Sequence, residues 1–274
     1  MFCAIKWGLA RGRGSIWGRG PGLFLALLLA YAPPVIADEG ADDPAHGETA
    51  EAADSAAREI WSGGENFGST WAFYTGITAA PDGDITQPGL RLRLLAGMST
   101  YDYRGSFGRA RAAQPFADLL GGYQWQVGAF TLKAFAGATG AADIRTLEQA
   151  LDLWGQTRIG PKVVGEAWWT INDQSWASLD VALSRPQSTT LWSRVRYGLR
   201  LLPQISLGPE AGLSGEAAQP RGRIGAFARF DWPAGEIAAS GGVAETADAL
   251  GTGLATGEKT RATPYLTLTW AQRF

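Results

Sequence analysis

The sequence has 274 residues, a formal net charge of −2 and only 18% charged residues, so it lacks the basic excess of a nucleic-acid-binding protein. Its 37 glycines and 12 tryptophans suit a sheet protein with tight turns, and tryptophan is also common where proteins meet a membrane interface. Outside the N-terminal segment there is no apolar run of 18 or more residues, which excludes a polytopic helical membrane protein.

Residues 1–37 predict a secretory signal peptide. Basic residues precede the apolar stretch LFLALLLAYA, and the small residues Val35 and Ala37 stand before Asp38 as at a cleavage site. The apolar stretch, at about ten residues, is too short to span a bilayer; an uncleaved N-terminal anchor is the alternative. Because the only cysteine, Cys3, lies in this segment, the mature chain is expected to lack disulfides and cysteine-ligated metals.

Residues 38–57, DEGADDPAHGETAEAADSAA, are acidic and contain no large apolar residue. Such a segment cannot bury enough apolar surface to fold, so we predict a disordered acidic linker. It contains His46, the only histidine of the chain. The remaining residues, 58–274, are then expected to form a single β-barrel domain.

From residue 58 onward the sequence alternates apolar and polar residues, as in FTLKAFAGA and SWASLDVALS. This period of two is typical of strands with one apolar and one polar face. Eleven strands are clear, at about 69–79, 88–100, 116–127, 129–138, 162–171, 175–184, 190–201, 204–214, 221–231, 235–243 and 264–274. Short connections such as VG and WPAG alternate with longer ones, including the expected loops 101–115 and 139–161. This alternation is typical of an outer-membrane barrel with short periplasmic turns and long external loops.

If both chain ends lie in the periplasm, the strand number must be even. Residues 58–67 supply the missing strand, so we predict an all-β, transmembrane antiparallel up-and-down barrel of twelve strands in the bacterial outer membrane, with ten strands as the alternative. The terminal Phe274 on an alternating strand resembles the assembly signal of such proteins, whereas a secreted β-sandwich is the competing interpretation. The predicted membrane-interface aromatics are Trp125, Trp169, Trp232, Trp270 and Phe274.

The polar face of the predicted strands carries many charges. We expect the lumen to be lined by Arg91, Arg93, Lys133, Lys162, Glu166, Asp180, Arg194, Arg196, Arg200, Glu210, Arg223 and Arg229, with Arg273, Asp118, Asp231 and Glu236 on the same face. These groups cannot face lipid, where an arginine at the midplane costs about 2–4 kcal/mol. Tight ion pairs would close the lumen into a scaffold, and looser packing would leave a narrow pore. Pro209 is expected to mark a β-bulge.

An enzyme is not predicted. The expected barrel contains no histidine and no cysteine, which removes the usual nucleophile–base pairs and transition-metal ligands. A glycoside hydrolase needs only two carboxylates, and Glu166, Asp180, Glu210 and Asp231 could face the lumen. Each alternates with basic residues, which favours ion-paired structural roles, so no catalytic residue, metal or cofactor is expected.

Several stretches resemble the BcsS family of cellulose biosynthesis proteins from alphaproteobacteria. They are WSG at 61–63, LRLRL at 90–94, LLGGYQWQVGAFTLKAFAGA at 119–138, GPKVVGEAWW at 160–169, LLPQISLGPEAGLSGE at 201–216 and RIGAFARFDWPAGEIAASGG at 223–242. The resemblance implies an accessory role in bacterial cellulose production or export, with outer-membrane lipid and either glucan or other cellulose-synthesis components as partners. The alternatives are an outer-membrane enzyme acting on glucan or lipid, and a surface adhesion barrel that binds extracellular matrix.

Overall fold

The structure of the chain is a computed structural model. It describes residues 56–68, 70–105, 108–147, 150–152, 157–186, 188–217, 221–247 and 260–274. The predicted signal peptide 1–37 and almost all of the predicted linker 38–57 lie outside the described residues. No helix long and apolar enough to cross a membrane occurs in the described part of the chain.

Every regular element of the described residues is a strand. The strands are β1 (Arg58–Phe67), β2 (Thr70–Ala79), β3 (Gly89–Gly105), β4 (Gly108–Val127), β5 (Phe130–Ala141), β6 (Ile144–Leu147), β7 (Ala150–Asp152), β8 (Arg158–Asn172), β9 (Ser175–Ser184), β10 (Thr190–Leu202), β11 (Ile205–Glu216), β12 (Arg221–Trp232), β13 (Gly235–Ala247) and β14 (Thr260–Arg273). All the pairings between them are antiparallel.

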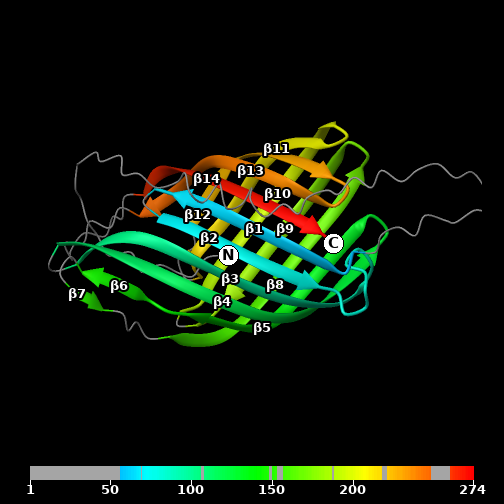
Figure 1. Ribbon diagram of the computed structural model, residues 1–274. Coiled ribbons are helices and arrows are strands. Elements are labelled where there is room, and N and C mark those ends of the chain that lie inside the picture. The colour runs from blue at the N-terminus through cyan, green and yellow to red at the C-terminus, as the bar shows by residue number, and fades with distance from the viewer. Residues whose placement is uncertain are drawn as a thin grey trace, which may run out of the picture. The chain divides into compact units, whose positions relative to one another are not determined.

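Twelve of these strands close into a barrel (Figure 1). Neighbours in sequence pair with one another, β5 pairs with β8, and β1 pairs with β14 to complete the ring. The pair of β6 and β7 stands outside the ring and attaches to β4. The prediction of a twelve-stranded antiparallel barrel is confirmed, and residues 58–67 form its first strand.

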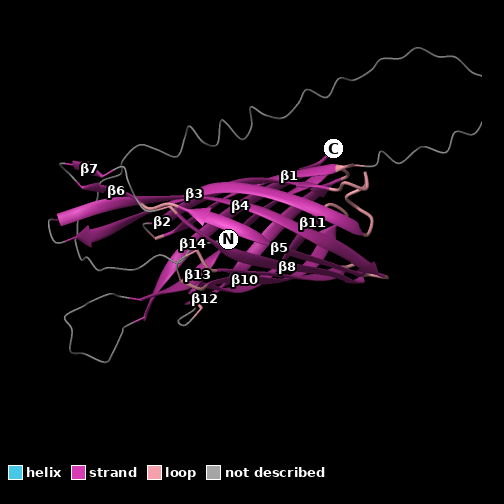
Figure 2. Cartoon of the chain, turned by 90° about the horizontal axis from the view of Figure 1, so that it is seen from below, coloured by secondary structure: helices cyan, strands magenta, loops and turns pink. Residues whose placement is uncertain are grey.

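The two ends of the barrel differ in their connections. At one end the turns 128–129, 173–174, 203–204 and 233–234 each span two residues, and the C-terminal residue lies at this end. The one longer connection among them is the loop 80–88 between β2 and β3. The opposite end carries the connections between β5 and β8, β9 and β10, β11 and β12, and β13 and β14. The two views agree that β6 and β7 lie at the end of the barrel opposite to the C-terminus (Figures 1 and 2).

The sequence prediction of long loops was wrong in two places. Residues 101–105 and 108–115 continue β3 and β4, whose pairing extends to Gly105 and Gly108. The stretch 139–161 contains the end of β5, the short strands β6 and β7, and the start of β8. Beyond the barrel wall a strand no longer needs an apolar face, so the period of two that reveals the other strands disappears there.

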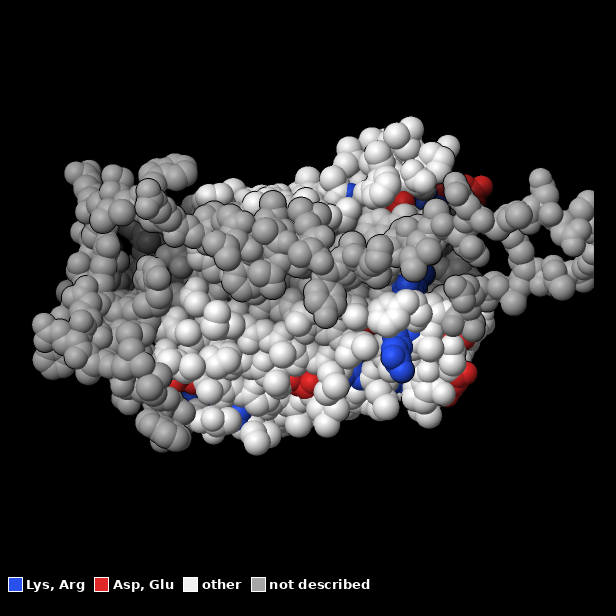
Figure 3. Space-filling model, viewed as in Figure 1, with Lys and Arg blue, Asp and Glu red and all other residues white. Residues whose placement is uncertain are grey.

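The outer and inner faces of the barrel are chemically opposite. The outward positions of β3 are Leu90, Leu92, Leu94 and Met98, and all are exposed. The alternating inward positions Arg91 and Arg93 are buried. The described surface visible in Figure 3 is mostly free of charged side chains. The sequence therefore places its apolar half outside and its charged half inside, the reverse of a water-soluble protein.

The predicted bulge at Pro209 is absent. The pairing of β11 with β12 runs without a shift from Ile205 to Ser214, and Pro209 pairs with Ala226 within it. Register shifts occur instead beside two short turns, between Arg200 and Leu202 and between Thr170 and Asn172. The missing N–H of a proline does not require a bulge at this point, because no β10–β11 pair is formed by residues 208 and 209.

Candidate functional site in the barrel lumen

The lumen contains a cavity of about 530 Å³. Its wall includes the cations Arg93, Lys133, Arg194, Arg196, Arg229 and Arg273, and the carboxylates of Glu59, Glu166, Asp180 and Glu236. Aromatic side chains of Trp61, Tyr74, Trp168, Trp176 and Trp192 complete much of the lining. Because the strands alternate, these groups come from most of the ring and converge on one interior.

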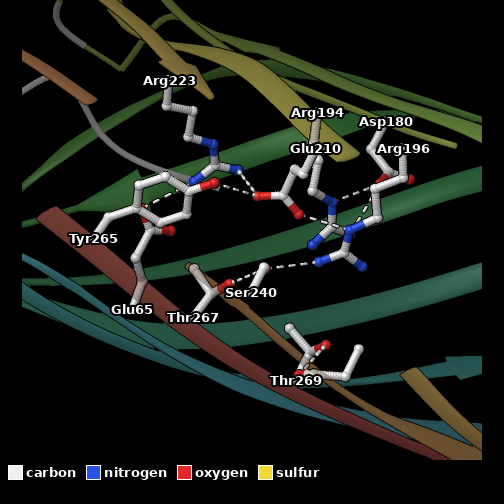
Figure 4. Close-up of polar contacts among 11 residues, drawn as sticks. Glu65, Asp180, Arg194, Arg196, Glu210, Arg223, Ser240, Tyr265, Thr267 and Thr269 are labelled. Atoms are coloured by element: carbon white, nitrogen blue, oxygen red, sulfur yellow. Dashed lines mark hydrogen bonds and ion pairs between the residues drawn. The ribbon is translucent and has the colours of Figure 1, made fainter. Parts of the chain in front are cut away.

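A buried network surrounds Glu210 of β11 (Figure 4). Arg196 of β10 donates from Nε to Glu210 Oε2 at 2.6 Å, and Tyr265 of β14 donates its hydroxyl to Glu210 Oε1 at 3.2 Å. Arg223 Nη2 lies 4.0 Å from the same Oε1. The Glu210 side chain has no exposed surface, so its charge is compensated entirely by these neighbours.

The same network reaches across the lumen to other strands. Arg223 of β12 donates to Glu65 of β1 at 3.0 Å, which joins strands separated by β13 and β14. Arg196 donates at 3.1 Å to Ser240 of β13, whose hydroxyl is hydrogen-bonded to Thr267. The interactions therefore connect six consecutive strands of the ring, from β10 through β14 to β1.

Two further ion pairs cross the other side of the lumen. Arg93 of β3 pairs with Glu166 of β8, and its Nε donates to Thr78 at 3.1 Å. The Arg93 guanidinium also lies 3.9 Å from the ring centre of Phe135. Lys162 of β8 pairs with Asp118 of β4 at 2.7 Å, and both side chains are buried. These contacts join strands that are not neighbours, so they reach into the interior from one part of the wall to another.

A smaller set of contacts lies nearer the short-turn end. Arg229 of β12 pairs with Asp231 at 2.6 Å and with Glu236 at 2.8 Å. Arg273 of β14 pairs with Glu59 at 3.5 Å, and the Arg273 side chain is 40% exposed. The charge pairs thus become more accessible to solvent toward the end of the barrel that carries the C-terminus.

Aromatic residues pack against this charged interior. Trp168 and Trp176 stack with their ring centres 4.2 Å apart, and Phe227 lies 5.3 Å from Trp176. The Arg229 guanidinium lies over Trp168 at 4.6 Å, a favourable cation–π arrangement. Trp176 is 1% exposed and occupies the place that a Cβ on Gly198 would take, so glycine is required there.

The loop 80–88 is held against the lumen at the short-turn end. Arg91 donates to the carbonyls of Asp84, Ile85 and Gln87, and the side-chain amide of Gln124 donates to Gln87 and to the adjacent carbonyl. Ile85 is buried and lines the cavity. Hydrogen bonds from Thr86 to the Asp84 carboxylate lower the pKa of that group below its ordinary value. This loop therefore covers part of the cavity.

The strand register places all twelve predicted lumen residues on the inward face, but it does not bring them all to the cavity. Arg91 serves the loop 80–88, and Arg200 donates to the carbonyl of Asp173 at a turn. Lys133 lines the cavity and forms no hydrogen bond or ion pair with any described residue. Thus the predicted set contains network members, loop anchors and one cation without a close partner.

The predicted interface aromatics lie near strand ends at the short-turn end of the barrel. Trp125, Trp169 and Phe274 are exposed, whereas Trp232 and Trp270 are half-buried on the outward register. Their contact with a membrane interface stays a prediction.

Sequence reasoning missed several members of the site. Glu65 and Glu59 lie on β1, whose sequence REIWSGGENF alternates too weakly to reveal its inward side. Tyr265 is inward by alternation on β14, but nothing in the sequence indicates that it reaches Glu210. Apart from its length, no sequence feature of the loop 80–88 indicates that it lies against the lumen.

Comparison with known proteins identifies the family. The model of the family described as cellulose biosynthesis protein BcsS matches residues 60–274. The chain belongs to the BcsS family. The resemblance found in the sequence is thereby confirmed, and this BcsS protein has an outer-membrane-type β-barrel fold. No curated protein matches the chain.

Several solved structures are similar to the BcsS barrel at low identity. The KdgM porin is 9% identical with a TM-score of 0.41, and the match covers 79% of this chain and 99% of that one. The translocator domain of the autotransporter NalP from Neisseria meningitidis is 13% identical with a TM-score of 0.45, covering 82% and 90%. The β domain of the Bordetella autotransporter BrkA is 12% identical with a TM-score of 0.46, covering 79% and 98%.

The carboxylates that a glycosidase would need are all engaged in the BcsS lumen. Glu166 pairs with Arg93, Asp180 with Arg194 at 2.9 Å, Glu210 with Arg196, and Asp231 with Arg229. A general acid requires a raised pKa, which an adjacent guanidinium opposes. Among the described residues, no group of three or more His, Cys, Asp or Glu side chains is arranged to hold a metal ion.

Proposed function

We propose that this BcsS protein is an outer-membrane barrel that serves cellulose biosynthesis as a scaffold with a closed lumen. Family membership supports the link to cellulose. The exposed apolar outer face and the predicted signal peptide of residues 1–37 support export to the outer membrane. Partners would be membrane lipid and other components of the cellulose-producing machinery.

The observation that carries the closed lumen is the set of contacts between strands that do not neighbour each other. Arg223 to Glu65 spans three steps of the ring, and Arg93 to Glu166 does the same on the other side. In a water-filled pore, charged side chains would extend along the wall and remain solvated. Here the side chains of Arg223 and Arg93 are 4% and 7% exposed, as expected for groups packed in a filled interior.

The loop 80–88 supports the same proposal. It covers part of the cavity at the short-turn end, and its backbone is bonded by Arg91 and Gln124. An ion would have to pass both this loop and the network around Glu210 to cross the barrel.

Conductance in a planar bilayer tests the closed lumen. We expect no stable current steps from the purified protein once its insertion has been verified by protease protection in vesicles. The double variant Arg196→Ala/Arg223→Ala removes two side chains that bridge non-neighbouring strands. It should conduct, provided that its heat-dependent shift in gel mobility shows that it is folded. Arg185→Ala, in the exposed connection between β9 and β10, is the matched control and should not conduct.

Steady current steps from the unaltered protein would overturn the closed lumen. The role in cellulose production is tested separately, by deleting the gene and measuring cellulose output. Output should fall and be restored by the unaltered gene, and the conducting variant should restore it as well if the lumen is not a path for the polymer. Unchanged output after deletion would overturn the cellulose role.

A further inference from the structure

Lys133 is the unusual charge of the lumen. It lies on β5 with Gln124 of β4 and Glu166 of β8 as its register neighbours, and it lines the cavity. Within the described ranges it forms neither an ion pair within 4.0 Å nor a hydrogen bond. Its register neighbour Glu166 interacts with it electrostatically but forms its ion pair with Arg93.

The other charges of the cavity wall are matched. Every lining carboxylate has an arginine partner: Glu166 pairs with Arg93, Asp180 with Arg194, Glu236 with Arg229 and Glu59 with Arg273. Arg196, the remaining lining arginine, pairs with Glu210. Arg229 has a second partner in Asp231, so the charges balance overall, and Lys133 is the lining cation that has no carboxylate within 4.0 Å among the described residues.

An ammonium group in a partly enclosed cavity is stabilised by an anion. Removing a charge from bulk water is costly unless a counter-charge or hydrogen bonds replace the lost hydration. The lining side chains Glu166 and Asp180 are 25% and 22% exposed, so this part of the wall is open to the cavity rather than packed. An anionic group beside Lys133 would give its ammonium the close partner that each lining arginine already has.

Free hydroxyl groups line the same cavity. Thr131 is two residues from Lys133 on β5, Ser178 belongs to β9, and both are register neighbours of Trp168. Both line the cavity, as does Tyr74 on β2. None of these three hydroxyls is hydrogen-bonded to another described residue. They offer donors and acceptors to a solute that is rich in hydroxyl groups.

We propose that this cavity binds a small anionic sugar, with Lys133 as the partner of its carboxylate or phosphate group and the hydroxyls of Thr131, Ser178 and Tyr74 as partners of its ring hydroxyls. The cavity wall reaches the half-exposed pair of Arg273 and Glu59, which gives the solute a route from the short-turn end. Binding of this kind needs no passage through the barrel, so it is compatible with a closed lumen.

Isothermal titration calorimetry on the protein purified in detergent tests the site. The probes are glucuronate, glucose 6-phosphate and neutral glucose. At least one of the two anionic probes should bind, which identifies the anionic group, and glucose should bind much more weakly. Lys133→Gln should weaken anion binding by at least about tenfold, the loss expected for one charge-assisted hydrogen bond.

Two control variants separate the role of Lys133 from general effects. Lys133→Arg keeps the charge and should retain most of the binding, whereas Arg185→Gln removes one charge outside the cavity and should leave binding unchanged. Equal affinity for glucose and the anionic probes, no binding of either anion, or unchanged binding by Lys133→Gln would overturn the proposal. None of these outcomes bears on the conductance test, so the two proposals fail independently.

Discussion

Replacing Glu210 by glutamine tests whether the ion-pair network holds the barrel interior together. The substitution keeps the shape of the side chain and removes its charge. Arg196, bonded at 2.6 Å, then loses its anionic partner, and Arg223 keeps only Glu65. Tyr265 can still donate to the amide oxygen.

The magnitude follows from burial. The side chains of Arg196 and Glu210 are 6% and 0% exposed, so the change leaves a guanidinium in the interior without its ion-pair partner. Breaking a buried pair by removing one partner costs about 3–5 kcal/mol. We therefore expect the free energy of unfolding to fall by about that amount, much of it through the unpaired Arg196.

Urea unfolding in lipid vesicles, followed by tryptophan fluorescence, measures this loss. The matched control is Glu59→Gln, whose partner Arg273 lies 3.5 Å away and is 40% exposed. Such an accessible pair contributes about 0–1 kcal/mol. If Glu210→Gln costs no more than Glu59→Gln, the network does not stabilise the barrel and the reasoning from burial is wrong.

Two further predictions concern the loop and the outer face. Arg91→Ala removes the hydrogen bonds to the loop 80–88, each worth about 1.5–3 kcal/mol for a charged donor. An Asp-specific endoproteinase should therefore cleave beside Asp84 faster than in the unaltered protein. Equal cleavage rates would show that the arginine does not hold the loop. Leu94→Arg, in mid-strand on the outer face, should cost about 2–4 kcal/mol in lipid, whereas Leu202→Arg beside a turn should cost about 0–1 kcal/mol; equal costs at the two depths would contradict a lipid-facing belt.

The sequence predicts the barrel well because its main constraint is local. An outward face that must be apolar and an inward face that must be polar impose a period of two on every strand of the wall. The range predicted for 175–184 coincides with β9, and the turns at 128–129 and 233–234 lie where the short connections were expected. Where the constraint ends, beyond the wall at 101–115, the prediction failed.

Contacts across the lumen are not predictable in the same way. Alternation identifies Arg194 as inward, and a neighbouring strand then offers Asp180, to which Arg194 is paired. The contact of Arg223 with Glu65 depends instead on barrel closure and on the stagger of the strands around the ring. The alternation of apolar and polar residues along one strand specifies neither the closure of the barrel nor the stagger of its strands. For the same reason Arg200, although inward by parity, is bonded to a turn carbonyl rather than to a carboxylate.

The charged interior also determines the register of the strands. In LWSRVRYGLRLLP of β10, the inward positions include Arg194 and Arg196, and the outward positions include Val195 and Tyr197. A slip of one residue would exchange the two faces and expose both guanidiniums to lipid. At about 2–4 kcal/mol for each arginine near the midplane, that slip is strongly disfavoured before any ion pair is counted. The arginines therefore act twice: in lipid they exclude the wrong register, and in the correct register they meet Asp180 and Glu210 and fill the lumen.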